Sequence, residues 1–554
     1  MSKNSRLVFL PLGGTGEIGM NMNLYGYGNE IDDMKWLIVD VGITFGDDTT
    51  PGVDVILPDH EFIKERKENL QGIIITHAHE DHVGGLAYLW PDLKCPIYAT
   101  AFTASIIRLK FEERGINIED KLNIVDLSSE IQIKPFDIKF QTLTHSIPEP
   151  NSLFIKTKLG TIYHTGDWKI DDNPIVGESI DFNQLKENSE EVLAMVCDST
   201  NVLTSGRSGS ESTVRGNLAG VIKKLKNRVF VTSFASNVAR LETIAAAAKE
   251  SGRSLVVLGR SMHRMISVAR QNGILKDIDV ILSEKDAAKK KKHEVLYLCT
   301  GSQGEPRGAM MRISNQDFPH IDIDQDDCVI FSSKIIPGNE KKLYKLHNQL
   351  VKEGIEVISE ESEYIHVSGH PNREDLRDMY NWIKPKSVIP VHGEHRHMLE
   401  HINFAKEMQV PYPIKVENGD IVRLYPGKKP EVFDKAPSGR LFVDGSVAVE
   451  EDSRSIKERK NISANGILDV TILVTPKGNI HNKPILNYSG LPINSDEEYQ
   501  YELENIIEKT ARTFMLNNQN QKDNIIDAIK ISCRKITKEI TGKKPVTNIK
   551  LIRI

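Results

Sequence analysis

The sequence lacks the features of an exported or membrane-spanning protein. Its five cysteines are scattered and form no CxxC pair, so we expect reduced thiols and neither a disulfide framework nor a zinc ribbon. No run of about 18 apolar residues suggests a membrane span. The first residues, MSKNSRLVFLPLGG, hold too short an apolar stretch for a signal peptide. We therefore expect a cytoplasmic protein that does not associate with membranes.

Positive charge is not in excess either. The formal net charge is -6 at pH 7, whereas nucleic-acid binders are often basic. This counts mildly against nucleic acid, but a local cationic groove or bound metal ions can hold phosphates on an acidic protein. The 554 residues exceed what one hydrophobic core usually supports, so we expect two or three domains.

The apolar runs indicate how these domains are arranged. In residues 1–205, short runs such as GIIITHAH and VLAMVCDST end in His, Asp or Ser, which is typical of a site at one edge of a sheet. Residues 206–352 alternate strand and helix patterns and predict a parallel sheet with flanking helices. The stretch YPGKKPEVFDKAPSGR marks a linker, assigned to residues 429–461, ahead of a small α+β domain at residues 462–554.

The densest cluster of candidate ligands lies in IIITHAHEDHVGG, residues 73–85. His77, His79, Asp81 and His82 follow the pattern HxHxDH. At a strand end, His77 and His79 can point to the same side, because side chains alternate with a period of two. Imidazole and carboxylate suit zinc or manganese, and no cysteine lies nearby. The segment therefore predicts a metal site.

Three further residues, His145, Asp167 and His392, could complete the coordination of two ions. Each ends or follows an apolar run and adjoins Gly, Pro or Ser. Two divalent ions about 3.5–4 Å apart can stabilise both the attacking and the leaving oxygen in phosphodiester hydrolysis. The simplest assignment has Asp167 bridging two sets, with His77, His79 and His145 for one ion and Asp81, His82 and His392 for the other.

The pattern HxHxDH followed by His, Asp and His is similar to the metallo-β-lactamase superfamily, whose members share an αβ/βα sandwich and a dinuclear zinc site. The long interval between Asp167 and His392 contains the α/β pattern of residues 206–352 and resembles the β-CASP insertion of the nucleic-acid-processing branch. Further strings look like the RNase J family: GGTGEIGMN, HTGDWK, TSFASNVAR, GRSM, CTGSQGEP, IPGNE and HVSGH.

This resemblance implies an α/β fold with defined domains. Residues 1–205 and 353–428 would form the two parts of a metallo-β-lactamase domain, and residues 206–352 the inserted β-CASP domain. The linker and the small carboxyl-terminal α+β domain would follow.

The resemblance also implies a function. It predicts a metal-dependent ribonuclease that cleaves RNA internally and degrades it 5′ to 3′, with a preference for a 5′-monophosphate, in rRNA processing, RNA maturation and mRNA decay. The cofactors would be two Zn²⁺ ions, with Mn²⁺ as the alternative. The partners would be RNA, further copies of the chain in a homodimer or homotetramer, and an RNA-degradation complex.

Residue roles carried over from the family are expectations of the same kind. His370 in HVSGH would be the general acid, held by Asp198 in CDSTN, and Asp81 would also serve catalysis. Glu80 would orient a ligand or a water, or face solvent. The expected contacts to the RNA backbone or its terminal phosphate are His366, Val367, Ser368, Gly369 and His370, together with Ser233, Ser236, Asn237, Ser302 and Gln303 on the insertion.

Three weaker features have two interpretations each. Asp54 and Asp444 could share a separate structural cation such as Ca²⁺, or lie at the surface. His164 is expected to pack beside the bridging Asp167 rather than to bind metal. The basic loop over residues 288–293 is a solvated loop or, less simply, a phosphate contact.

Other functions remain open at this level. A DNA-directed β-CASP nuclease or a small-molecule hydrolase would use the same ligands. A non-catalytic RNA-binding subunit of a degradation complex is a third alternative, against which the complete ligand set counts.

Overall fold

The computed structural model describes residues 5–189, 191–276, 278, 281–427, 429–475, 480–517 and 522–554. The chain forms two compact units: residues Met1–Thr44 with Leu57–Gly439, and residues Phe45–Ile56 with Arg440–Ile554. Within the described residues, no helix combines the length and apolarity that a membrane crossing requires. The site is built entirely in the first unit.

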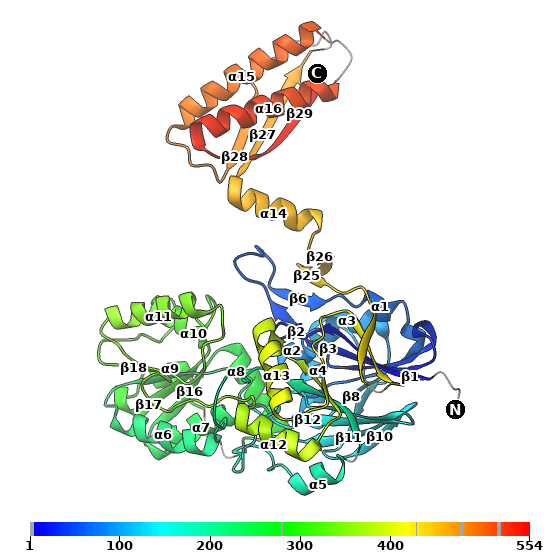
Figure 1. Ribbon diagram of the computed structural model, residues 1–554. Coiled ribbons are helices and arrows are strands. Elements are labelled where there is room, and N and C mark those ends of the chain that lie inside the picture. Colours follow the sequence, from blue (N-terminus) through cyan, green and yellow to red (C-terminus); the bar gives the residue numbers. More distant parts are fainter. Residues whose placement is uncertain are drawn as a thin grey trace. The chain divides into compact units, whose positions relative to one another are not determined.

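Two facing sheets enclose the main core of the first unit (Figure 1). Buried side chains such as Phe9, Leu37, Phe140, Ile155 and Ile389 fill the space between them. Helices cover the outer face of the second sheet, where Tyr163, Met195 and Val388 pack with residues of the helices that follow. Central strands such as VLAMVCD are therefore apolar on both faces.

The eight-stranded sheet has the order β24-β23-β1-β3-β4-β7-β8-β9. Its strands β4, β7, β8 and β9 run parallel, whereas β1 pairs antiparallel with β3 and β23. The strands are β1 (Arg6–Gly13), β3 (Met22–Gly28), β4 (Lys35–Val39), β7 (Leu70–Ile74), β8 (Ile97–Ala99), β9 (Leu122–Ile124), β23 (Asp420–Tyr425) and β24 (Glu431–Lys435).

The seven-stranded sheet has the order β10-β11-β12-β13-β14-β20-β22. Strands β13, β14 and β20 are parallel neighbours, so their carboxyl ends meet at one edge. The strands are β10 (Glu130–Ile133), β11 (Phe136–Thr142), β12 (Asn151–Thr157), β13 (Gly160–His164), β14 (Val192–Asp198), β20 (Ser387–Val391) and β22 (Tyr412–Pro413), and the short pair β2 (Thr15–Gly16) and β21 (Gly393–Glu394) lies apart from them in a two-stranded sheet.

The helices that belong to this sandwich connect its strands. They are η1 (Ile31–Asp33), α1 (Glu61–Lys64), η2 (Lys67–Asn69), α2 (Glu80–Val83), α3 (Leu86–Leu93), α4 (Ala101–Glu113), α5 (Phe182–Glu187), α12 (Arg373–Ile383) and α13 (His395–Glu407). Of these, α5, α12 and α13 supply Leu185, Met379 and Phe404 to the core outside the second sheet.

A separate parallel sheet is inserted between β14 and β20, as the alternating pattern predicts (Figure 1, green). Its order is β16-β17-β15-β18-β19, and its buried side chains include Phe230, Tyr297 and Val329. Its elements are α6 (Glu211–Lys224), β15 (Val229–Thr232), α7 (Val238–Glu250), β16 (Ser254–Leu258), α8 (Arg260–Gln271), α9 (Glu284–Ala287), η3 (Lys292–Glu294), β17 (Val295–Cys299), α10 (Ala309–Ser314), β18 (Cys328–Phe331), α11 (Glu340–Lys352) and β19 (Glu356–Ile358).

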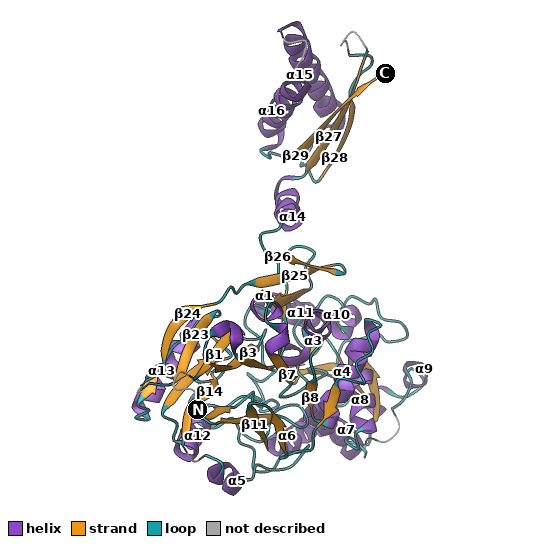
Figure 2. Ribbon diagram, turned by 90° about the vertical axis from the view of Figure 1, so that its right-hand side faces the viewer, coloured by secondary structure: helices purple, strands orange, loops and turns teal. Residues whose placement is uncertain are grey.

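The second unit is a small α+β structure. In both ribbon views α15 and α16 lie together on one side of the three-stranded sheet β28-β27-β29 (Figures 1 and 2). Val470, Leu503 and Cys533 are buried between them. The elements are α14 (Arg454–Asn465), β27 (Ile467–Val474), β28 (Ile485–Ser489), α15 (Asp496–Asn517), α16 (Lys522–Thr541) and β29 (Val546–Arg553).

The segment 429–461, predicted as a linker, is folded for most of its length. It contains β24, most of helix α14, and two strands, β25 (Arg440–Asp444) and β26 (Val447–Glu450). The latter two join β6 (Val55–Pro58) and β5 (Thr44–Phe45) in a four-stranded sheet of order β26-β25-β6-β5. Pro, Gly and Lys in this segment mark turns between short strands rather than an extended connection.

Candidate metal centre

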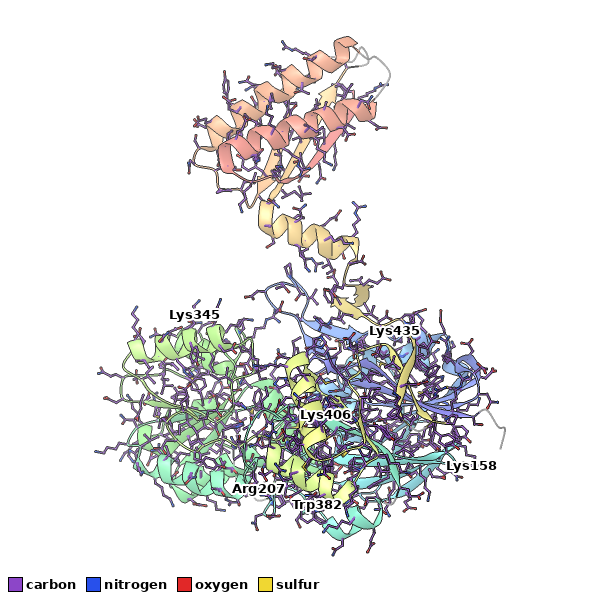
Figure 3. All side chains as sticks on the ribbon, viewed as in Figure 1. Lys158, Arg207, Lys345, Trp382, Lys406 and Lys435 are labelled. Carbon is purple, nitrogen blue, oxygen red and sulfur yellow. The ribbon has the colours of Figure 1, made fainter. Side chains whose placement is uncertain are left out.

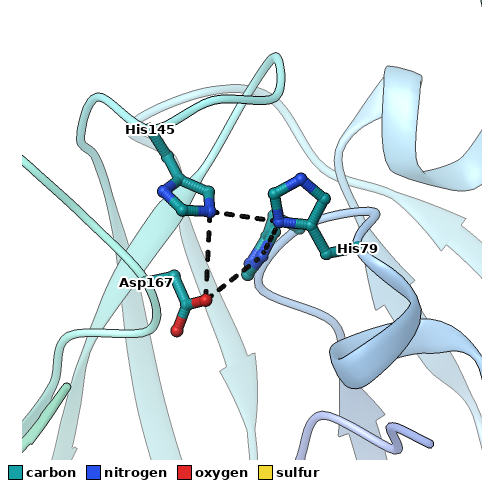
Figure 4. A group of neighbouring side chains, drawn as sticks. His79, His145 and Asp167 are labelled. Carbon is teal, nitrogen blue, oxygen red and sulfur yellow. Dashed lines mark hydrogen bonds and ion pairs between the residues drawn. The ribbon is translucent and has the colours of Figure 1, made fainter. Parts of the chain in front are cut away.

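One group of ligand-type side chains comprises His77, His79, His145 and Asp167. His77 follows β7, His145 follows β11 and Asp167 follows β13, so each lies just beyond a strand end. The Nδ1 atom of His79 lies 3.1 Å from Nε2 of His77 and 3.1 Å from Nε2 of His145 (Figure 4). Oδ2 of Asp167 lies 3.9 Å from Nε2 of both His77 and His145.

The second group comprises Asp81, His82, Asp167 and His392. The helix α2 carries Asp81 and His82, and His392 follows β20. Oδ2 of Asp167 lies 3.2 Å from Nε2 of His82 and 3.6 Å from Nε2 of His392. The same carboxylate oxygen therefore faces both groups, as a bridging ligand would.

The first group has the protonation state that a metal requires. Burial lowers the pKa of His77 and of His145 well below the usual value, and it lowers the pKa of His79 to about 4. The three rings are therefore neutral. Neutral imidazole is the form that binds a cation. Two nitrogens bound to one tetrahedral zinc ion would lie about 3.3 Å apart, close to the observed separations.

The second group has the charge that a metal requires. Burial opposes the ionised form of Asp167, but His392, His82 and His370 outweigh it and lower the pKa of this carboxyl group. Burial likewise opposes charge on His82, yet Asp167, Asp81 and Asp40 raise its pKa. The three carboxylates thus favour a positive charge at this ring, and a metal ion would take the place of the proton, because only neutral imidazole binds metal. Buried carboxylates and imidazoles thus converge on one point, which fits a divalent cation of the zinc or manganese type.

Asp40 supports this centre although the sequence patterns do not single it out. Its Oδ2 lies 2.7 Å from Nδ1 of His82, and Oδ1 accepts a hydrogen bond from the Thr76 N–H. A carboxylate on the far nitrogen of a ligand histidine fixes the ring orientation and raises its basicity. Asp40 has a left-handed backbone with φ 65°, and His392 has φ 53°, which marks both as strained positions.

We expect Asp40→Asn to weaken binding at the His82 group by about 10–100-fold. Asparagine tolerates the left-handed backbone, so the variant removes the charge and not the turn. Zinc titration against a competing chelator measures the effect, with Asp33→Asn, an exposed carboxylate, as the control. Unchanged affinity for both ions would contradict the supporting role of Asp40.

Asp198, which is buried, and His370, whose side chain is 21% exposed, form a pair at the rim of the centre. Nδ1 of His370 lies 2.8 Å from Oδ2 of Asp198 and 3.8 Å from Oδ2 of Asp167. The other oxygen of Asp198 accepts hydrogen bonds from the N–H and the hydroxyl of Thr200. Burial opposes the charged ring, but Asp198 and Asp167 outweigh it and raise the pKa of His370 to about 9. The ring is therefore a cation at neutral pH.

The loop 366–370 contacts the metal centre through its backbone. The carbonyl of Gly369 faces Nδ1 of His145 at 2.5 Å, so it fixes the orientation of that ring. The hydroxyl of Ser368 accepts hydrogen bonds from Asn201 Nδ2 and from the His370 N–H, which closes the loop on itself. Val367 is buried. Of the five predicted contact residues, His366 and His370 carry imidazole rings that can donate a hydrogen bond or a proton to a ligand.

Several predicted contacts on the insertion lie at the carboxyl ends of its strands. Ser233 follows β15 and Ser302 follows β17, which are neighbours in the sheet. Both hydroxyls are buried and have no hydrogen-bond partner among the described residues. Asn237 instead caps α7 by accepting from the Arg240 N–H, and Ser236 precedes it at this helix start. Gln303 accepts from the Ile336 N–H, so its side chain serves the fold.

Two other predicted residues have partners within the first unit. Glu80 forms an ion pair with Lys110 of α4, at 2.6 Å from Oε1 to Nζ, which ties the loop of the metal ligands to that helix. Nδ1 of His164 lies 2.8 Å from the hydroxyl of Tyr25, and burial lowers the pKa of His164 to about 4. His164 thus packs beside the centre, as expected, and lies outside both ligand groups.

The second cation site stays a prediction without support. In the second unit, Oδ2 of Asp444 pairs with Arg459 at 2.6 Å, and Asp54 is exposed. Across the described part of the chain, neither carboxylate belongs to a group of three or more ligand-type side chains. In the basic loop, Lys289 pairs with Asp286 and Lys292 with Asp324, which agrees with a solvated loop.

Four family descriptions match successive parts of the chain. They are the Beta-lactamase superfamily domain at residues 48–182, Ribonuclease J, beta-CASP domain at 226–350, Zn-dependent metallo-hydrolase RNA specificity domain at 354–416, and Ribonuclease J C-terminal domain at 454–554. Together they span the sandwich, the insertion and the second unit.

Whole proteins are similar over most of their length. Ribonuclease J of Sinorhizobium meliloti is 39% identical over 557 residues, which covers 100% of this chain and 98% of that protein. Ribonuclease J of Synechocystis is 36% identical and covers 93% of this chain and 80% of that protein. A solved structure of a protein of unknown function from Enterococcus faecalis is similar with a TM-score of 0.53 and 16% identity. The match covers 76% of this chain and 100% of that chain, and it shows a likeness of fold alone.

Proposed function

This chain belongs to the ribonuclease J family, and on that premise we propose that it hydrolyses RNA phosphodiester bonds with the help of divalent metal ions. The observation that carries the proposal is the Oδ2 atom of Asp167, which faces both ligand groups while the His370–Asp198 pair lies beside it. Two ligand groups with an adjacent acid are what an in-line displacement at phosphorus needs.

The residues of the chain then divide the work. Two divalent ions held by the two groups would supply an activated water at neutral pH and offset charge on the phosphoryl oxygens. His370 donates Nδ1–H to Asp198, which leaves its second ring proton, on Nε2, for the leaving 3′-oxygen. The Gly369 carbonyl orients the ring of His145, and the Asp40 carboxylate orients the ring of His82, each through the ring nitrogen Nδ1. Asp81 serves as a ligand, which is its contribution to catalysis.

RNA recognition is proposed for the edge of the insertion and the loop 366–370. The hydroxyls of Ser233 and Ser302 are buried and have no partner among the described residues, so they would donate to a phosphate only where RNA binding uncovers them. The 5′-monophosphate preference, the exonuclease and endonuclease modes, and roles in RNA maturation and decay follow from the family. Zinc is the proposed ion because three imidazoles form the first group, with manganese as the alternative. Assembly into dimers or tetramers, a degradation complex and a cytoplasmic location are proposed on family membership alone.

The test is cleavage of RNA labelled at its 5′ end. We expect 5′-monophosphorylated RNA to be degraded faster than 5′-triphosphorylated RNA, and the reaction to stop in a chelator and return with zinc or manganese. A DNA strand of the same sequence serves as the control for the DNA-directed alternative. Equal cleavage of DNA, or RNA cleavage that survives the chelator, would refute the proposal.

A further inference from the structure

Arg240, in α7 of the insertion, carries a fully buried guanidinium group. Its Nε and Nη2 atoms donate to the carboxylate of Glu211 at distances of 3.0–3.1 Å. Glu211, the first residue of α6, is 2% exposed. A buried ion pair of this kind is costly to place unless its remaining donors are satisfied, so the other contacts of Arg240 matter.

The remaining donors of Arg240 reach two further segments. Its Nη1 atom lies 2.8 Å from the carbonyl oxygen of Ser332, just beyond β18, and 3.1 Å from that of Ile365. The hydroxyl of Ser332 also donates to the Ile365 carbonyl, at 2.7 Å. The guanidinium thus joins the insertion sheet to the segment by which the chain returns to the metal centre.

The segment by which the chain enters the insertion is also anchored to the sandwich. Arg207 lies where the chain passes from the sandwich into the insertion, and it pairs with Asp378 of α12 at 2.7 Å (Figure 3). The buried Lys169–Asp171 pair holds the next residues, because Asp171 accepts from the Ser210 hydroxyl and the Glu211 N–H. Glu211 is therefore anchored to the sandwich before it meets Arg240.

His366 also contacts the guanidinium group of Arg240. Its Nδ1 atom lies 3.3 Å from Nη1 of Arg240. Nη1 carries two hydrogens and also contacts the Ser332 carbonyl, the Ser332 hydroxyl and the Ile365 carbonyl at shorter distances, so its donation to Nδ1 is shared. Because a guanidinium can only donate, this contact favours a lone pair on Nδ1 and the ring proton on Nε2. Burial and the neighbouring Arg240, Lys334 and Lys169 lower the pKa of His366, which agrees with a neutral ring. Among the described residues the ring forms its hydrogen bond through Nδ1, and the side chain is half-buried, which leaves Nε2 for a ligand.

We propose that Arg240 is a positioning residue for RNA binding: it fixes the loop 366–370 and sets the His366 tautomer, so that His366 offers Nε2–H to an RNA phosphate. This inference rests on the function proposed above. The side chain of Arg240 has its hydrogen bonds with Glu211, Ser332, Ile365 and His366, none of which is a metal ligand. It acts through Ile365 and His366, on a loop that also carries the Gly369 carbonyl and the His370 acid.

The test replaces the ion pair without leaving a buried charge. Arg240→Met with Glu211→Leu exchanges two charged groups for apolar ones of similar size, a change that proteins often accept without loss of stability. We expect KM for 5′-monophosphorylated RNA to rise about tenfold to hundredfold, the worth of a hydrogen bond to a charged group, with a smaller fall in kcat because the same loop carries His370. Arg240→Lys keeps the charge and should recover part of the affinity.

The control is Arg228, a half-buried cation beside the insertion sheet. Arg228 pairs with the buried Asp327 at 2.9 Å, near the amino ends of β15 and β18 and away from the loop. Arg228→Gln should lower the melting temperature and leave KM unchanged. A parental KM in both Arg240 variants, or an equal rise in KM for Arg228→Gln, would overturn the proposal. Parent protein that fails to cleave RNA would instead refute the proposed function.

Discussion

Asp167→Ala is expected to remove most of the hydrolytic activity and at least one equivalent of bound metal. Among the described residues, Asp167 is the member shared by both ligand groups, with Oδ2 at 3.2 Å from His82 Nε2 and 3.9 Å from His77 Nε2. Without this anion, the two ions would repel each other across a buried site and lose a shared ligand. Bound metal ions stabilise the charge that develops in the transition state by several kcal/mol. Their loss should therefore lower the rate by about 10³-fold or more.

The measurement combines metal analysis of the purified variant with RNA cleavage at saturating zinc or manganese. Asp137→Ala is the matched control, because Asp137 is an exposed carboxylate on β11 of the same sheet. A folded variant is expected, because burial lowers the pKa of the neighbouring His77 and His145, and neutral rings need no counter-charge to stay buried. Parental metal content together with a parental rate would show that Asp167 bridges nothing.

The ligand groups were predictable because their residues are chemically distinctive and end strands. His77, Asp167 and His392 each follow an apolar run, and the parallel order β13-β14-β20 brings such ends to one edge. The inserted parallel sheet was predictable for a similar reason, since its strands and helices alternate regularly. The predicted family and fold class are confirmed by the matches over residues 48–182, 226–350 and 454–554.

What could not be predicted depends on contacts between distant segments. Asp40 follows a buried strand and meets His82, 42 positions along the chain. The Gly369 carbonyl meets His145 across 224 positions, and a backbone group leaves no trace in the sequence. Arg240 lies in the helical stretch NVARLE, where an arginine usually indicates an exposed face, yet it is buried.

The predicted RNA contacts stay predictions, since hydrogen bonds within the protein do not show which side chains contact RNA. Short polar side chains in Gly- and Ser-rich loops suit phosphate binding and loop closure equally well. Ser368, Asn237 and Gln303 use their side chains within the protein, whereas Ser233 and Ser302 remain without partners in the described structure. Residue type alone could not separate the two sets.

His370→Gln is expected to lower RNA cleavage by about 10²–10⁴-fold while both metals stay bound. The ring lies outside the two four-residue ligand groups, and the third, three-residue group that contains it shares Asp167 and adds only its partner Asp198. Glutamine keeps a polar side chain of similar reach but cannot give up a proton to the leaving 3′-oxygen. A phosphodiester with a p-nitrophenolate leaving group needs no such proton, so the variant should cleave it at nearly the parental rate.

The pH dependence distinguishes a proton donor from a residue that only shapes the site. A general acid works in its protonated form, and Asp198 and Asp167 raise the pKa of His370 to about 9 against the effect of burial. Asp198→Asn removes one of these charges, so the pKa falls and the rate should begin to decline at lower pH than in the parent. Metal analysis of both variants is the control. Loss of metal in His370→Gln, or an unmoved alkaline limb in Asp198→Asn, would assign the pair to the structure of the centre and not to proton transfer.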